Sequence, residues 1–297
     1  MNGVINIYKE KGYTSHDAVA DVRKILKQKR IGHTGTLDPE AEGVLPVCIG
    51  KATKAVEYLM DFRKTYQATL EFGIITSTQD YTGEILSQKK VDFDEEKIKE
   101  AVFSFLGEYE QIPPMYSAIK VNGKRLYQLA REGKTVERKA RKVYIYHIDI
   151  LSFLPPNQIK IEVECSKGTY IRTLCEDIGN KLGFGAYMKD LIRTKVGIFE
   201  IENSIKINEL RRQVELGNID KILIKTDDLF YQYNAVKIQY SGEKYLKNGN
   251  NIHYSYVEQL TNDIKIGDIV RVYSYKDEFI GLYEIRSNYL KPLKLFL

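Results

Sequence analysis

The chain has 297 residues, of which 43% are hydrophobic and 29% are charged. This composition excludes an intrinsically disordered protein, and the length favours two domains. The three cysteines form no CxxC pair, so neither a disulfide framework nor a zinc site is expected. No signal peptide and no run of about 18 apolar residues is apparent, which predicts a cytoplasmic protein that has no membrane partner.

Positive charge is concentrated in one segment of the chain. The net charge of +5 over all residues is small for a chain of this length. Between positions 120 and 142, however, nine basic residues face only Glu132 and Glu137. An ordinary solvated loop and a surface that binds a polyanion both fit this pattern.

The first elements expected are a strand, a helix and a loop. Apolar residues over positions 4–8 predict a short strand. Thr14 or Ser15 can cap the following helix, and Asp17 completes a capping box with Thr14. Apolar residues at helical spacing continue this helix to Leu26. A loop containing glycine and proline is expected over positions 32–43.

Two strands and two helices are predicted in the middle of the chain. Residues 66–72 and 159–165 alternate between apolar and polar side chains, as half-buried strands do. Positions 95–106 and 171–182 carry apolar residues at helical spacing. This order predicts an α+β fold with a mixed or antiparallel sheet and flanking helices, and not a series of βαβ units.

A smaller β-rich unit is predicted at the C-terminal end. After about Asn234 the pattern changes to short strands, two of which are joined by a turn at Lys276 and Asp277. The chain is therefore expected to divide into a domain of residues 1–234 and a β-rich domain of residues 235–297.

Three features could carry chemistry, and each also has an ordinary structural explanation. Asp38 could act as a nucleophile presented by its loop, or simply form an Asp-Pro turn. Tyr66, near the start of a strand, could contact a substrate or pack in the core. The turn from Lys167 to Arg172 could bind a phosphate or carboxylate, or only cap a helix. Together with the basic segment and 22 tyrosines, these features favour RNA over duplex DNA as the partner.

Three ordered motifs resemble those of the TruB-type tRNA pseudouridine synthases. They are GHTGTLDPEAEGVLPVCIGKATK at positions 32–54, KTYQATLEFG at positions 64–73 and CSKGTYIRTL at positions 165–174. IPPMYSAIKVNGKRLYQLAREG, at positions 112–133, is similar to an insertion of that family, and the RNA-binding insertion is expected to span about 112–142. GDIVRVY and FIGLYEI are similar to parts of a PUA domain. The resemblance implies a pseudouridine synthase catalytic domain followed by a PUA-like RNA-binding domain.

The resemblance also implies a reaction and its three central residues. The family isomerises uridine 55 in the T loop of tRNA to pseudouridine after flipping the base, without a cofactor or a metal. Asp38 is then the nucleophile, and Arg172 pairs with its carboxylate. Tyr66 stacks on the target uracil and is a candidate for removing its C5 proton. The sequence leaves open whether Asp38 attacks uracil C6 or ribose C1′.

Further residues are implied around the substrate and along the RNA. His33 matches a position that helps to displace the flipped nucleotide, and Leu191 matches a position in a helix near the active site. The full set of implied substrate contacts is His33, Lys9, Lys54, Asp80, Tyr170, Lys167 and Leu191. The implied contacts to the RNA backbone are Lys120, Lys124, Arg138, Lys139, Arg141 and Lys142.

Other kinds of RNA-binding protein make different predictions. A tRNA-binding or tRNA-folding protein in which catalysis is secondary would share the basic surface. An enzyme guided by small RNAs would carry an N-terminal extension and basic tails, so the expected partner is the T-stem loop of tRNA, without a guide RNA or an obligate protein partner. Glu10 stands where the family usually has proline, and Ile192 where it commonly has arginine. These two departures put contacts to the RNA in question and leave the reaction unchanged.

The charge of the 112–142 insertion predicts a salt-dependent affinity for tRNA. If four to six of its cations meet phosphates, the logarithm of the affinity falls with the logarithm of salt concentration by roughly 0.7 to 0.9 per contact. Titrations of tRNA over a series of salt concentrations measure this slope. The variant to compare carries neutral residues at Arg138, Lys139, Arg141 and Lys142, and we expect a flatter slope from it. An unchanged slope would refute the prediction.

Overall fold

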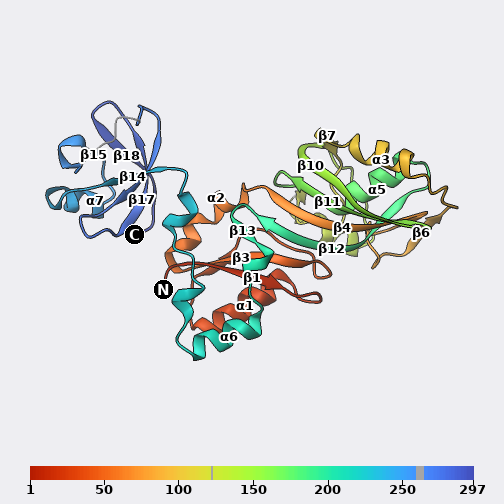
Figure 1. The fold of residues 1–297 in the computed structure, drawn as a ribbon, viewed down its shortest axis with the longest axis horizontal. Helices are drawn as coiled ribbons and strands as arrows, with labels where there is room; N and C mark the ends of the chain where they lie inside the picture. The colour runs from red at the N-terminus through yellow and green to blue at the C-terminus, as the bar shows by residue number, and fades with distance from the viewer. Residues whose placement is uncertain (122, 259–263) are drawn as a thin grey trace.

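The protein is described here by a computed structural model that covers residues 1–121, 123–258 and 264–297. Figure 1 shows an elongated molecule, with a small sheet at one end of the long axis and a large sheet extending from the middle to the other end. The N-terminus and the C-terminus both lie at the side of the large sheet that faces the small one.

The large sheet has nine strands. Seven of them follow the order β1-β3-β12-β4-β11-β10-β7, while β2 pairs with β3 and β13 pairs with β12. The strands are β1 (Gly3–Lys9), β2 (Ile31–His33), β3 (Glu42–Ile49), β4 (Lys64–Phe72), β7 (Gly107–Gln111), β10 (Arg141–Leu154), β11 (Gln158–Cys165), β12 (Ala186–Val196) and β13 (Phe199–Glu200). Because β3 and β12 pair in parallel whereas β12 and β4 are antiparallel, the sheet is mixed, as predicted.

The alternating pattern of the sequence gives the central strands two different faces. In β4 and β11 the apolar side chains, among them Leu70 and Ile161, point into one hydrophobic core. Their polar neighbours point to the other face, where Gln67 donates to Glu162 at 3.1 Å. The predicted strands over 66–72 and 159–165 are therefore confirmed.

The helices cover the sheet in two groups. They are α1 (Ser15–Leu26), α2 (Val56–Met60), α3 (Glu95–Phe103), α4 (Leu126–Arg131), α5 (Ile171–Lys181), α6 (Ile207–Glu215) and α7 (Glu243–Lys247), with 3-10 helices η1 (Gly50–Ala55), η2 (Ile201–Asn203), η3 (Ile219–Lys221), η4 (Asp227–Phe230), η5 (Tyr240–Gly242) and η6 (Tyr254–Tyr256). Helices α3 and α5 pack with β4, β10 and β11 around one core, and α1 and α6 pack with β1 and β3 around another. None of the helices in the described ranges is long and apolar enough to cross a membrane.

The predicted helix starts agree with the structure more closely than the predicted ends. Thr14 is the N-cap of α1, and its side chain and that of Asp17 form the expected capping box. Helix α3 ends at Phe103, three residues before the predicted end, and α5 ends at Lys181. The expected loop over 32–43 is shorter than predicted because β2 reaches His33 and β3 begins at Glu42.

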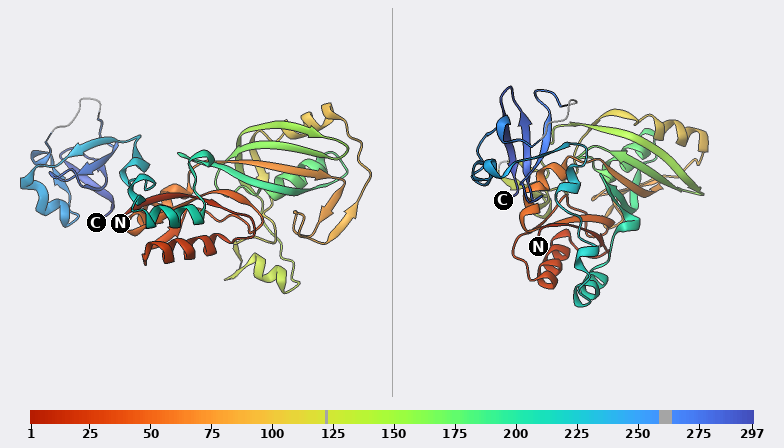
Figure 2. Two further views of the ribbon diagram at one scale, coloured as in Figure 1. Left: turned by 60° about the horizontal axis from the view of Figure 1, so that its bottom comes forward. Right: turned by 60° about the vertical axis from the view of Figure 1, so that its left-hand side comes forward.

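The segment over 112–142 projects from the body of the protein. It contains β8 (Lys120–Val121), β9 (Lys124–Arg125) and helix α4, which the left view of Figure 2 shows in yellow-green beside the main body. The buried side chain of Leu126 anchors this segment. Its last two basic residues, Arg141 and Lys142, already belong to the long strand β10.

The C-terminal part forms its own sheet, with strand order β14-β16-β17-β18-β15. Its strands are β14 (Asn234–Lys237), β15 (Ile252–His253), β16 (Ile269–Tyr273), β17 (Phe279–Ile285) and β18 (Tyr289–Leu295). Outside both sheets, β5 (Ile74–Thr76) and β6 (Ile85–Gln88) form a two-stranded hairpin. The predicted turn at Lys276 and Asp277 joins β16 to β17. Phe230, Leu282 and Phe296 pack in one core with residues of η1, α2 and β3, so a continuous apolar contact joins the two sheets.

Replacing Phe230 with alanine should loosen this contact. Phe230 is 2% exposed, and its ring meets those of Tyr58 and Phe296. We expect the variant to lose about 3–5 kcal/mol of unfolding free energy, because a cavity replaces the ring. Denaturant titrations measure this loss. The adjacent Tyr231 is 67% exposed, so Tyr231→Ala is the control, and an equal effect of both changes would contradict the assignment.

Candidate functional site

The loop that carries Asp38 is held by a serine at the start of α1. The Ser15 hydroxyl donates to the carbonyl oxygen of Leu37 at 3.2 Å and accepts from the backbone N–H of Leu37 at 2.9 Å. Ser15 is 1% exposed, and Leu37 packs in the core beside α5. The backbone next to Asp38 is therefore fixed by two hydrogen bonds and one buried side chain.

Lys9 fixes the other side of the same loop. Its ammonium group donates to the carbonyl oxygens of Tyr13 at 2.6 Å and Pro39 at 3.1 Å, and the side chain is almost fully buried. Burial lowers the pKa of Lys9 to about 8, against the opposing effect of the negative charge of Asp38. Lys9 thus ties the residue after Asp38 to the turn that follows β1.

The Arg172 guanidinium, at the start of α5, contacts both carboxylates of the site. Its Nε lies 3.0 Å from Asp38 Oδ2, and its Nη1 lies 3.7 Å from Asp80 Oδ2. It also donates to the carbonyl oxygens of Thr78 at 3.0 Å and Tyr116 at 2.8 Å. The Arg172 side chain is 6% exposed, whereas that of Asp38 is 41% exposed. A buried cation therefore orients a carboxylate that still reaches solvent.

Asp80 is oriented by a compact turn before β6. Its Oδ1 accepts from the Thr78 hydroxyl at 2.6 Å and from the backbone N–H of Thr82 at 3.0 Å. The turn is tied to β12 because the backbone N–H of Met188 donates to the Gln79 carbonyl at 3.0 Å. Asp80 consequently faces Arg172 as a second, largely buried carboxylate.

Tyr66 points to the same side of β4 as the core beside α5, as its place in the alternating pattern predicted. Burial raises the pKa of its hydroxyl, while the charge of Arg193 acts in the opposite direction. The negative charge of Asp38 also raises the pKa of Tyr66, so the two side chains share one electrostatic environment. The structure thus brings Asp38, Tyr66 and Arg172 together, and their catalytic roles remain predictions.

His33 and Leu191 lie on strands around this site. His33 is the last residue of β2, half-buried, and its ring meets that of His16 edge-on at 5.5 Å. Burial, followed by the charge of His16, lowers the pKa of His33. Leu191 is buried in β12, so the prediction that it lies in a helix is wrong. The alternation of buried residues along 186–196 is the signal for a strand that the resemblance obscured.

Three other expected contacts have protein partners. The Lys54 ammonium donates to the carbonyl oxygens of Leu295 at 3.0 Å and Leu297 at 3.2 Å, so it lies at the junction with the C-terminal sheet and not at Asp38. Lys167 pairs with Asp61 at 2.6 Å on the surface. Gln111 binds both the backbone N–H and the carbonyl of Tyr170, at 2.8 and 2.9 Å.

Several of the basic residues over 120–142 already have partners within the protein. Lys142 pairs with Glu108 at 2.8 Å, and Lys124 pairs with Glu132 at 3.3 Å. Arg138 is half-buried and donates to the Pro113 carbonyl at 3.0 Å. Exposed pairs of this kind are weak, so phosphates can replace the carboxylates. Arg138 differs because it also holds the segment together. The other basic residues expected to contact RNA, namely Lys120, Lys139 and Arg141, are exposed.

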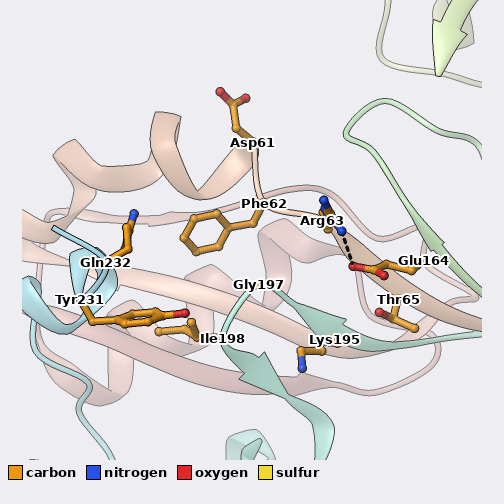
Figure 3. A pocket seen from close by; sticks show the side chains of 10 residues that line it. All are labelled: Asp61, Phe62, Arg63, Thr65, Glu164, Lys195, Gly197, Ile198, Tyr231 and Gln232. Atoms are coloured by element: carbon orange, nitrogen blue, oxygen red, sulfur yellow. Dashed lines mark ion pairs between the residues drawn. The ribbon is translucent and has the colours of Figure 1, made fainter. Parts of the chain in front are cut away.

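A cleft of about 720 Å³ lies away from this site (Figure 3). Thr65 and Glu164 line it, and each is next to a residue that faces the core beside α5. Because neighbours in a strand point to opposite faces, the cleft lies on the other side of the sheet from Tyr66. Arg63 and Glu164, 3.6 Å apart, span one wall of it.

Ser15 and Arg193 are the positions that sequence reasoning missed. The sequence indicates Ser15 only as a possible cap of α1, and it gives no role to Arg193. Thr14 takes the capping role, which leaves the Ser15 hydroxyl free for Leu37. The sequence does offer one signal for Ser15: two possible capping residues, Thr14 and Ser15, follow one another, and only one of them can cap the helix. Arg193 is 1% exposed, and its burial carried no signal in the sequence.

Comparisons with known proteins agree on one family. Residues 23–171 match the TruB family pseudouridylate synthase N-terminal domain, and residues 172–229 match the tRNA pseudouridylate synthase B C-terminal domain. The chain is 50% identical over 297 residues to tRNA pseudouridine synthase B of Clostridium novyi, covering 100% of each. It is 48% identical over 309 residues to the protein of the same name from Lachnoclostridium phytofermentans, again covering 100% of each.

Solved structures of similar fold are RNA-protein and multiprotein complexes. The chain superposes on one chain of a structure described as a Cbf5-Nop10-Gar1 complex, with a TM-score of 0.74 and 29% identity, covering 99% of this chain and 85% of that one. A structure of an H/ACA RNP bound to a substrate RNA containing 2'-deoxyuridine gives a TM-score of 0.74 and 28% identity, with the same coverage. The α+β fold is shared with these proteins.

The buried ammonium of Lys9 should make stability depend on pH. Its pKa is about 8 in the folded chain and 10.5 ordinarily, so the unfolded chain binds more protons between these values. The cost of burying the charge is present below pH 8 and disappears as the pH rises to about 10.5. We expect wild type to gain about 2–3 kcal/mol relative to Lys9→Met between pH 7 and pH 10.5.

Denaturant titrations at the two pH values measure this difference. Lys51→Met, at an exposed position of η1, serves as the matched control. A difference between wild type and Lys9→Met that stays constant with pH would contradict the prediction.

Proposed function

The chain belongs to the TruB family of tRNA pseudouridine synthases, and from this premise we propose that it converts uridine 55 in the T loop of tRNA to pseudouridine, with Asp38 as the nucleophile. The observation that carries the proposal is the ion pair between Asp38 and Arg172. It joins a half-exposed carboxylate to a buried guanidinium at 3.0 Å, on a loop fixed on both sides.

The reaction needs only groups that this site contains. The bond between N1 and C1′ breaks, the base turns, and a bond forms between C5 and C1′. The hydrogen on C5 leaves as a proton and N1 gains one, so uridine and pseudouridine are isomers and no electrons are exchanged with another molecule. We therefore expect no cofactor and no metal. An aspartate can act covalently by attacking either uracil C6 or ribose C1′.

Each central side chain has a physical role in this proposal. Arg172 orients the Asp38 carboxylate, which lies 3.0 Å from its Nε. The target base must leave its stack at a cost of roughly a few kcal/mol. Stacking on Tyr66, at about 1–3 kcal/mol per base, offsets that cost. The hydroxyl of Tyr66 is also the candidate that removes the C5 proton.

The surrounding residues extend the proposal to the RNA. We place His33 and Leu191 against the flipped nucleotide, because both border the loop and strand that carry Asp38 and Tyr66. Lys9 and Asp80 act by holding Asp38 and Arg172. The segment over 112–142 binds the T-stem loop through its exposed cations, and residues 235–297 form a PUA-like unit beside the catalytic domain of residues 1–234. Lys54 contributes by joining these two units, and Lys167 and Tyr170 border the site.

Release of tritium from tRNA tests the reaction. Wild type should release tritium from C5-labelled uridine in an unmodified tRNA transcript, and Asp38→Ala should release none, because the nucleophile is missing. Asp92→Ala is the control, since the Asp92 side chain is 87% exposed and pairs with Lys97 at 3.6 Å, whereas Asp38 and Asp80 pair with Arg172. Release should also stop when uridine 55 is replaced by cytidine.

The same experiment separates the alternative function. A tRNA-folding protein would bind and anneal tRNA equally well with Asp38→Ala, and wild type would release no tritium. Loss of release with Asp92→Ala as well would indicate general damage to the protein. Tritium release by Asp38→Ala at the wild-type rate would disprove the role of Asp38.

A further inference from the structure

Arg193, in the middle of β12, is a buried cation without an anionic partner. It is 1% exposed and is among the largest fully buried side chains. None of the ion pairs within residues 1–121, 123–258 and 264–297 includes it. A buried charge of this kind is costly unless polar groups of the protein surround it. Such a group either stabilises the fold or serves the chemistry next to it.

The guanidinium of Arg193 is bound to both ends of the segment that carries Asp38. Its Nε donates to the carbonyl oxygen of Val44 at 2.7 Å, and its Nη2 donates to that of Gly35 at 3.3 Å. Gly35 lies three residues before Asp38, and Val44 lies six residues after it. One planar side chain therefore closes the base of the loop, in addition to the contacts of Ser15 and Lys9 in its middle.

The backbone of Arg193 also pairs with two strands of the site, β3 and β4. Arg193 lies opposite Tyr66 in the antiparallel pair of β12 and β4, and opposite Gly43 in the parallel pair of β12 and β3. A Cβ atom at Gly43 would lie 2.2 Å from the carbonyl oxygen of Arg193, so only glycine permits this approach. Arg193 thus stands at the point where the Asp38 loop and the Tyr66 strand meet.

The charge of Arg193 acts on the groups around it. It opposes the rise in the pKa of Tyr66 that burial causes. It adds to the effect of burial in lowering the pKa of Lys9 and Lys64. Three ionisable side chains around it, those of Tyr66, Lys9 and Lys64, therefore experience this cation.

We propose that Arg193 is a positioning residue of the reaction, which fixes the Asp38 loop and Tyr66 relative to each other across the junction of β3, β12 and β4. The inference rests on the proposed function, because it assigns Arg193 to the step that Asp38 and Tyr66 perform. A displacement of about 1 Å in such a pair can slow a reaction about 100-fold without changing how the substrate binds. The planar fork of arginine suits this position, since two separate nitrogens, Nε and Nη2, each reach a carbonyl at one end of the loop.

The test compares Arg193→Met, Arg193→Lys and Arg271→Met. Arg271, in β16, is the matched control because its guanidinium also donates to backbone carbonyls, those of Tyr233 at 2.9 Å and Asp227 at 3.5 Å, away from the site. We expect Arg193→Met to lower the single-turnover rate of pseudouridine formation about 100-fold, with the Kd for tRNA changed by less than about threefold. Arg193→Lys should recover part of the rate, and Arg271→Met should retain the wild-type rate.

A double-mutant cycle shows whether Arg193 acts through Tyr66. If it does, combining Arg193→Met with Tyr66→Phe slows the reaction by less than the product of the two single effects. Strictly multiplicative effects would overturn the coupling. A wild-type rate in folded Arg193→Met, or equal losses in Arg193→Met and Arg271→Met, would overturn the proposal. If Arg193→Met fails to fold, Arg193→Lys tests the proposal instead. A slower single-turnover rate with a nearly unchanged Kd for tRNA supports it, and a wild-type rate overturns it.

Hydrogen exchange separates this inference from the proposed function. Arg193→Lys should speed amide exchange over residues 34–43 while Arg271→Met leaves it unchanged, whether or not the protein forms pseudouridine. If wild type releases no tritium from tRNA, the proposed function fails and faster exchange still shows that Arg193 holds the loop. Unchanged exchange in that loop would overturn the positioning role itself.

Discussion

The buried guanidinium of Arg172 is the group on which the geometry of the site depends. Its charge requires acceptors because water is excluded around it, and the acceptors come from Asp38, from the Asp80 turn and from Tyr116 in the projecting segment. These segments are separated by dozens of residues in the chain and share no sheet pairing that would place them. One planar side chain satisfies them together, which a point charge such as lysine could not do.

Around that group the fold keeps the framework buried and the Asp38 carboxylate accessible. Ser15 and Lys9 bind the backbone on both sides of Asp38, so the loop has little freedom although it lies between two strands. A carboxylate on a loop held in this way is positioned before any ligand arrives, so the cost of ordering it is not added to a later step. The projecting segment is anchored through Tyr116 to the same guanidinium. The projecting segment is thereby connected to Asp38 through Arg172.

Local patterns predicted the elements well, and side-chain environments less well. The strands that hold Tyr66 and Ile161 and the capping box at Thr14 follow from spacing that depends only on neighbours in the chain. Leu191 lies in the strand β12 and not in the helix that the resemblance implied, because its environment depends on the pairing of β12 with β3 and β4. Lys54 could not be assigned because its partners belong to the end of the chain, more than 200 residues away.

The sequence by itself determined the family, the motif that contains Asp38 and the elements with clear periodicity, such as β4, β11, α1 and α5, because these depend on residue identity and short-range spacing. Only the tertiary structure decided that the site is held by Ser15 and Arg193, and that basic residues such as Lys142 already have acidic partners. The physical reason is that burial and pairing depend on distances between segments far apart in the chain. Those distances exist only after β3, β12 and β4 have come together.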